Sequence, residues 1–424
     1  MSNMGSSDQQ WQPPARPDWV EKVNAAGRGL DLRGIVRLDA DELIATAIKN
    51  TGLSDFGVDD WREPFHLLVN GLEQDADLNL LGRIMTRSDL LRTLQARLRI
   101  EDTYKQHPEI ADQVIKAPLL ITGAARTGTS ALLNVLASDP ENQAPLCWEA
   151  WLPVPPPEDA TYDSDPRIEQ ADCMARMWSD IVPEYTAIHE VRGHVPVEDN
   201  FLHELSFRSQ VMIWHGKNPS YLYWISTADL KPANDYMVRV LKLLQWKHKR
   251  RRWVIKTPSL AVPLELLFET FPDAQMVYTH RDPAMSIQSG INIVNATYWI
   301  RSDNHQSHQA LCTAVTSEDA IAAATNHNLD LLENNAVPNK QILHVLYKDF
   351  IQDNVKTVQR IYDHFGIAFS EASRKAVEEY VKENASARKA AGLTRYAHAS
   401  PQKLAKVRQL FKRYQAYFGV PNET

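Results

Sequence analysis

The chain has 424 residues, of which 44% are apolar and 23% are charged, and it carries a formal net charge of −7. These values are typical of a folded, soluble protein with one large domain or two ordinary ones. The negative balance argues against a nucleic-acid-binding protein, which usually carries a basic domain.

Cysteines and apolar runs indicate the compartment. Cys147, Cys173 and Cys312 form no CxxC pair and no metal-like cluster with histidines, so we expect no metal site. Such a sparse, odd set is typical of a reducing compartment. No apolar run reaches the roughly 18 residues of a membrane span. Residues 1–17 are polar and lack the apolar core of a signal peptide. We therefore predict a cytoplasmic protein without an integral membrane segment, with a disordered tail at 1–17.

Two regions follow the tail. Residues 18–115 are predicted to form an N-terminal helical region, because stretches such as Leu81–Leu98 carry apolar residues at helical spacing. Residues 116–424 alternate predicted strands with predicted helices and are expected to form a single α/β domain.

The α/β domain opens with a predicted strand, loop and helix. Pro118–Gly123 is a short apolar run that ends in glycine, which is the pattern of a buried strand. A helix then begins at Thr127 or Gly128 and runs to about Ala137, where Ser-Asp-Pro ends it.

The loop between this strand and helix resembles a Walker A loop with one residue changed. Gly123 and Gly128 have the Walker A spacing, and Ser130 stands at its Ser/Thr position. The lysine that would follow Gly128 is Thr129. P-loop kinases and ATPases use that lysine on the β- and γ-phosphates. The loop is therefore suited to a phosphate, but not to a triphosphate with its metal.

The same loop offers several hydrogen-bond donors to an anion. Backbone N–H groups and a helix N-terminus attract negative charge. Arg126 and the hydroxyls of Thr127, Thr129 and Ser130 add side-chain donors.

The region of about 148–250 is predicted to form a helical insertion. A proline-rich loop at 152–166 precedes a helical stretch at 171–244 that is rich in aromatic residues. These aromatics fit an apolar acceptor pocket or the core of a helical subdomain equally well. The aromatics are Trp178, Tyr185, Phe201, Phe207, Trp214, Tyr221, Tyr223 and Trp224.

Histidines and glutamates in this insertion are candidates for a general base. Histidine is the usual base near neutral pH. We take His189 and Glu198 as the leading candidates, although a structural role is open for each. His194, His203 and Glu204 lie nearby, but their spacing fits no common zinc pattern.

Three more strands are predicted after the insertion, at Trp253–Lys256, Ala274–His280 and Gln341–Tyr347. One helix is expected at Leu260–Phe271, and three more at about 354–365, 370–383 and 401–418. This alternation predicts a parallel sheet flanked by helices. Ligands bind beyond the carboxyl ends of such strands.

Two cations follow strand ends at this edge of the predicted sheet. Arg281, in Thr-His-Arg-Asp-Pro, can pair bidentately with a phosphate, or it is held by a surface carboxylate. Lys256 can neutralise charge that develops in a reaction, or it is a solvated lysine.

Together these motifs resemble those of the sulfotransferases that use 3′-phosphoadenosine 5′-phosphosulfate (PAPS), in their bacterial branch. The segment Gly123–Ser130 is similar to the family's 5′-phosphosulfate loop. Arg281 with Ser289 is similar to its 3′-phosphate motif. The resemblance covers about Leu119 to Val420, and it implies the P-loop-like sheet of that family with a helical acceptor insertion.

The resemblance implies PAPS as the donor and assigns roles to residues. Arg126, Thr127, Gly128, Thr129 and Ser130 would hold the 5′-phosphate.

Arg281 and Ser289 would hold the 3′-phosphate, and Tyr347 falls near the adenine contact. Lys256 and Arg126 would stabilise charge on the leaving phosphate. Animal-type relatives carry a catalytic histidine where this chain has Pro258, so the base must come from elsewhere, with His189 first and Glu198 second.

The resemblance implies a small-molecule hydroxyl acceptor, such as a lipid, steroid or phenol, and leaves a homodimer open. Two other functions remain open on the sequence. One is a P-loop kinase acting on a small molecule, against which Thr129 argues. The other is a nucleotide-binding protein without enzymatic activity.

Overall fold

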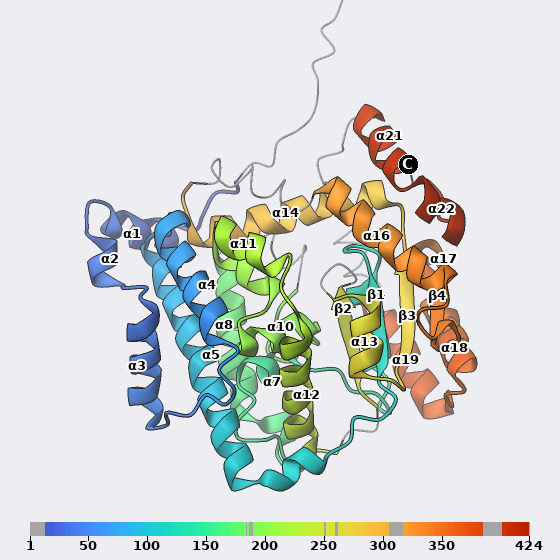
Figure 1. Ribbon diagram of the computed structural model, residues 1–424, viewed down its shortest axis with the longest axis horizontal. Helices are drawn as coiled ribbons and strands as arrows, with labels where there is room; N and C mark the ends of the chain where they lie inside the picture. The colour runs from blue at the N-terminus through green and yellow to red at the C-terminus, as the bar shows by residue number, and fades with distance from the viewer. Residues whose placement is uncertain are drawn as a thin grey trace, which may run out of the picture.

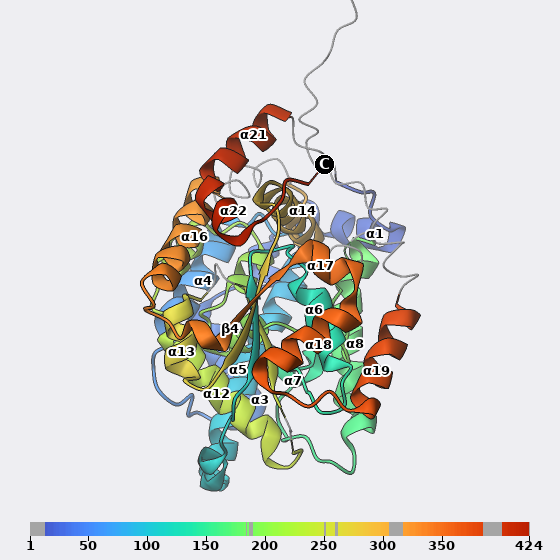
Figure 2. The ribbon, with the colours of Figure 1, turned by 90° about the vertical axis from the view of Figure 1, so that its right-hand side faces the viewer.

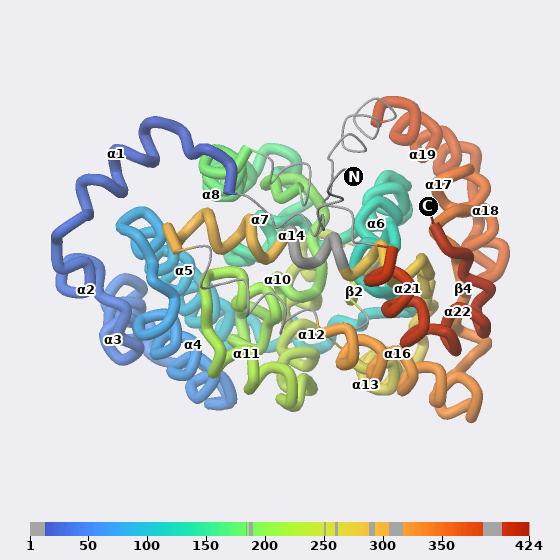
Figure 3. The backbone as a smooth tube through the Cα atoms, turned by 90° about the horizontal axis from the view of Figure 1, so that it is seen from above, coloured from blue at the N-terminus to red at the C-terminus, as the bar shows by residue number. Residues whose placement is uncertain are grey.

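The computed structural model describes residues 13–183, 185, 190–249, 252–258, 262–304, 317–384 and 401–423, and only the backbone of 288–292. A helical part lies beside a part built on a four-stranded sheet (Figure 1). Helix α14 (Pro283–Arg301) runs from the sheet to the N-terminal helices, as the view from above shows (Figure 3).

The sheet is parallel and confirms the predicted α/β class. Its strands are β1 (Leu119–Gly123), β2 (Val254–Pro258), β3 (Gln275–His280) and β4 (Ile342–Leu346), in the order β2-β1-β3-β4. Every residue of β1 is buried, because helices cover both faces of a parallel sheet.

Alternating side chains of β1 attach the two helical layers. Leu119 and Ile121 pack with α6 (Thr129–Ala137), α18 (Asn354–Phe365) and α19 (Glu371–Glu383). Leu120 points to the opposite face and packs with α13 (Leu264–Thr270). Figure 2 shows these helices on the two sides of the sheet.

Five helices form the N-terminal part. They are α1 (Asp18–Gly27), α2 (Leu32–Ile35), α3 (Ala40–Thr51), α4 (Arg62–Asp75) and α5 (Leu80–Gln106). Of the predicted tail at 1–17, residues 1–12 lie outside the described residues. Arg16 is buried, forms an ion pair with Asp303, and donates to the Ser302 carbonyl at 2.8 Å.

The aromatic-rich insertion folds as short helices whose aromatics mainly form core. The helices are α7 (Cys147–Trp151), α8 (Pro166–Ile181), α10 (Asp199–His203), α11 (Pro219–Ile225) and α12 (Lys231–Trp246). Trp178, Tyr185 and Phe201 are buried in one hydrophobic cluster. Phe207 and Tyr221 are buried in another, with the N-terminal helices. For these five residues the structure favours the core interpretation.

The end of the chain differs from the prediction in three places. Helix α16 (Glu318–Glu333) was not predicted. Tyr347 does not end β4 but begins α17 (Tyr347–Gln352). The single helix expected at 401–418 breaks at Phe411 into α21 (Pro401–Leu410) and α22 (Lys412–Phe418). Phe411 and Tyr414, on either side of the break, both lie in one apolar cluster.

Five short 3₁₀ helices complete the secondary structure of the described residues: Pro108–Asp112, Tyr162–Ser164, Glu204–Ser206, Gln210–His215 and Asn339–Gln341. Among these residues no helix combines the length and the apolar character needed to cross a membrane.

The contact between α5 and α14 gives a test of the packing. A Cβ on Gly82 would lie 2.0 Å from the backbone oxygen of Arg301. We therefore expect Gly82→Ala to lower the free energy of unfolding by roughly 1–3 kcal/mol, although alanine is the better helix former. Ser88→Ala, at an exposed position of α5, is the control and should leave stability equal or slightly raised. A Gly82→Ala protein as stable as its parent in denaturant titrations would show that the two helices are not packed as described.

Candidate active site

The carboxyl edge of the sheet gathers the residues that sequence patterns singled out. In register, Gly123 of β1 pairs with Pro258 of β2 and with Thr279 of β3. Arg281 follows β3, and Tyr347 follows β4. Parallel strands bring their following loops to one edge, so these residues share one site.

Backbone constraints fix the loop between β1 and α6. Gly123 has φ of 155° and Gly128 has φ of 90°, in the region that favours glycine. A Cβ added to Gly123 would lie 2.2 Å from the Thr279 hydroxyl oxygen, and one added to Gly128 would lie 2.9 Å from the Tyr347 ring. Arg126 also has a positive φ, of 68°. The loop is therefore held tightly, with glycine required at its two ends.

The Thr127 hydroxyl holds the loop onto the sheet. It donates to the Ala124 carbonyl at 2.8 Å and lies 2.6 Å from the Thr279 hydroxyl. Thr129 is also buried, whereas Ser130 is exposed at the start of α6. Of the three loop residues that carry a hydroxyl, Ser130 is thus the most exposed.

Lys256 joins this loop to the helical insertion. Its Nζ donates to the Ser130 Oγ at 3.0 Å and to the Glu198 Oε2 at 2.5 Å. Only 8% of Lys256 and 6% of Glu198 is exposed, so Lys256 is not a solvated surface lysine. Glu198 immediately precedes α10, which packs against β2. The Lys256 ammonium thus contacts both the loop and Glu198, the carboxylate candidate for the general base.

Asp199 is a carboxyl of this site that sequence reasoning missed. It is fully buried, and neither of its oxygens makes a hydrogen bond of ordinary geometry with the described residues. Burial raises its pKa to about 8, and the adjacent charge of Glu198 adds to this, while the nearby Thr257 hydroxyl lowers it. Asp199 is therefore largely protonated at neutral pH.

The three histidines singled out in the insertion differ in their surroundings, and one of them is not described. His189 lies outside the described residues. His203 is buried, and burial lowers its pKa to about 4. A histidine with this pKa and no access to solvent is poorly placed as a general base. His194 is exposed.

Arg281 lies where the loop, β3 and β4 meet. Its Nη1 donates to the Arg126 carbonyl at 3.0 Å, and its guanidinium lies 4.0 Å from the centre of the Tyr347 ring. Its Nε and Nη2 donate to the carboxylate of Glu423, which raises the Arg281 pKa against the opposing effect of burial. Ser289 lies in α14, and its side chain is outside what the structure describes.

The described part of the chain holds no group of three or more His, Cys, Asp or Glu residues that could bind a metal ion. The site combines the glycine-bounded loop with the buried ammonium of Lys256, the partly exposed guanidinium of Arg281, and the buried carboxyls of Glu198 and Asp199.

Comparison with known proteins identifies the family. A sequence model described as "Sulfotransferase family" matches residues 118–371, more than half of the chain. The chain belongs to the sulfotransferase family. Every strand of the sheet, the loop, Glu198, Lys256, Arg281 and Tyr347 lie inside the matched range.

Solved structures place it in the bacterial branch of this family. The sulfotransferase STF1 from Mycobacterium tuberculosis H37Rv is 30% identical, with a TM-score of 0.70 over 88% of this chain and 99% of that chain. The sulfotransferase STF9 from Mycobacterium avium shares the fold at 23% identity, with a TM-score of 0.78 over 91% and 98% of the two chains.

Two curated relatives are also bacterial sulfotransferases. The omega-hydroxy-beta-dihydromenaquinone-9 sulfotransferases Stf3 of Mycobacterium bovis and Mycobacterium tuberculosis are 23% identical over 287 residues, which cover 65% of this chain and 70% of theirs.

The protonated state of Asp199 in this sulfotransferase predicts a pH dependence of stability. An unfolded aspartate has a pKa near 3.9, so between about pH 4 and about pH 8 the folded protein retains a proton that the unfolded chain releases. Stability contributed by this group therefore falls as pH rises through that window. Asp199→Asn, which cannot titrate, should become steadily more stable relative to the parent from about pH 4 to about pH 8. A difference in unfolding free energy that does not change with pH would contradict the assignment.

Proposed function

We propose that the chain transfers a sulfuryl group from PAPS to a hydroxyl group of a small, apolar acceptor. The observation that carries this proposal is the position of Lys256, whose Nζ contacts both Ser130 of the phosphate loop and Glu198 of the insertion. Sulfuryl transfer needs an anion site beside a proton acceptor, and Lys256 joins these two groups.

The residues at the sheet edge fit such a donor. The glycine-bounded loop and the start of α6 offer N–H groups to a 5′-phosphate. The Arg281 guanidinium, stacked on the Tyr347 ring, suits a 3′-phosphate beside an aromatic base. Thr129 in place of a Walker lysine fits a donor that carries no triphosphate. When bound, PAPS would supply an activated sulfuryl group with adenosine 3′,5′-bisphosphate (PAP) as its leaving group.

Glu198 is the proposed general base. A carboxylate at this place would accept the proton of the acceptor hydroxyl as its oxygen attacks sulfur. Lys256 would then stabilise negative charge that develops on the leaving phosphate oxygen. His189 remains the alternative base.

The acceptor proposed is a hydroxylated apolar molecule such as a lipid, steroid or phenol. The name of the Stf3 relatives describes a hydroxylated quinone lipid as their acceptor, which supports this class.

Donor binding tests the proposal first. Isothermal titration should show PAP binding to the full chain, and Arg281→Ala should weaken it by at least tenfold, because a charge-assisted bidentate contact is lost. Arg33→Ala, an exposed arginine of α2, is the control and should bind as the parent does. Absence of PAP binding, together with turnover of Mg-ATP, would instead favour a kinase.

Glu198→Gln tests the base. This variant should lower kcat for sulfuryl transfer from labelled PAPS by about 10²–10⁴-fold, the usual range for a general base, while PAP affinity stays within a few-fold. Glu190→Gln, at an exposed glutamate eight residues earlier, is the matched control. If transfer is retained in Glu198→Gln and lost in His189→Ala, then His189 is the base.

A further inference from the structure

The proposed 3′-phosphate ligand already holds an anion from its own chain. Arg281 Nε donates to Glu423 Oε1 at 2.9 Å, and its Nη2 donates to Glu423 Oε2 at 2.8 Å. This is the paired-donor geometry with which a guanidinium also binds phosphate. The two residues are 142 positions apart in the sequence, so the contact is purely tertiary.

Further contacts position Glu423 on Arg281. Its backbone N–H donates to the Asp282 carboxylate at 2.8 Å, and its carbonyl accepts from Arg408 at 2.6 Å. Arg408 also pairs with Asp282 at 2.6 Å. Two guanidinium groups and two carboxylates therefore form one charge-balanced cluster around Glu423.

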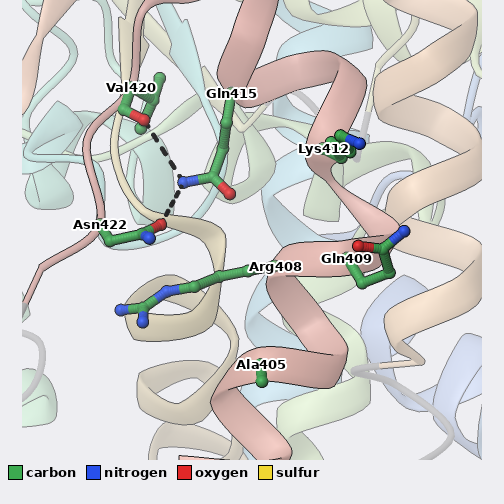
Figure 4. A pocket seen from close by; sticks show the side chains of 7 residues that line it. All are labelled: Ala405, Arg408, Gln409, Lys412, Gln415, Val420 and Asn422. Atoms are coloured by element: carbon green, nitrogen blue, oxygen red, sulfur yellow. Dashed lines mark hydrogen bonds between the residues drawn. The ribbon is translucent and has the colours of Figure 1, made fainter.

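The segment 420–423 is bound on one side and open on the other. Gln415 donates to the Val420 carbonyl and to the Asn422 side chain, as Figure 4 shows. Val420 and Asn422 of the same segment line an open pocket of about 440 Å³. The pocket is lined by Ala405, Arg408, Gln409, Lys412, Gln415, Val420 and Asn422.

The Arg281–Glu423 pair is partly exposed to solvent. The Glu423 side chain is 30% exposed and that of Arg281 is 19% exposed. Solvent therefore reaches the pair, and an anion from solution can compete with the Glu423 carboxylate for the guanidinium. A phosphate monoester carries close to two negative charges, so it competes well against a single carboxylate.

We propose that segment 420–423 is a latch in which the Glu423 carboxylate occupies the position of the donor's 3′-phosphate. The donor binds only by displacing this carboxylate from Arg281, and Asp282 with Arg408 retains the segment close by. This proposal rests on the proposed function, since it takes Arg281 as the 3′-phosphate ligand. The latch acts on nucleotides with a 3′-phosphate and not on those without one.

Two nucleotides and one substitution test the latch in the full chain. Glu423→Gln should tighten binding of PAP by about fivefold, because it removes the partly exposed ion pair that competes with the 3′-phosphate. Binding of AMP, which lacks the 3′-phosphate, should be unchanged. Glu423→Ala should behave as Glu423→Gln does, because the charge and not the shape is decisive. Glu378→Gln, at an exposed position of α19, has the same change in net charge and should leave both affinities unaltered.

The outcomes separate the latch from the proposed function. If Arg281→Ala weakens PAP binding but Glu423→Gln leaves it unchanged, the latch is wrong and the donor site stands. If Glu423→Gln weakens PAP binding, Glu423 orients Arg281 for the donor and the latch is equally wrong. If neither the parent nor Glu423→Gln binds PAP, the proposed function itself fails.

Discussion

The buried ion pair between Lys256 and Glu198 is the interaction on which the site depends. Removing one partner of a buried pair typically costs about 3–5 kcal/mol, because the other charge is left without compensation. The pair therefore fixes the start of α10 against β2, and through Ser130 it also fixes the position of the ammonium relative to the loop between β1 and α6. The loop and the helical insertion, which are separate in sequence, thereby share one cation.

The parallel sheet makes this arrangement possible. Its register sets Gly123, Pro258 and Thr279 side by side, so the loops that follow three strands meet at one edge. Thr127 and Thr279 then hold the loop between β1 and α6 onto β3 through their hydroxyls. The backbone pairing of the sheet positions the charged groups at this edge, so no long flexible loop is needed to bring them together. Such preorganised charge is what transfer of an anionic group requires.

Local patterns predicted the sheet class, the loop and the ends of β1 and β3, because glycine spacing and apolar runs are signals carried by neighbouring residues. Helix α16 had such a signal in its Ser317 cap and alanine-rich first turns, which the prediction overlooked. For Arg281 the sequence analysis allowed a surface carboxylate as partner, but it could not name Glu423, since contacts between distant residues leave no local pattern. Asp199 was missed for a similar reason. Its raised pKa comes from burial, which only the packed fold determines.

A double-mutant cycle on kcat for sulfuryl transfer tests the coupling of Lys256 and Glu198 most directly. The account predicts that Glu198→Gln and Lys256→Met each lower kcat strongly, and that the double variant is little worse than the poorer single one, because the two residues act as a unit. Losses that multiply in the double variant would show that the two residues act independently, and would contradict the account.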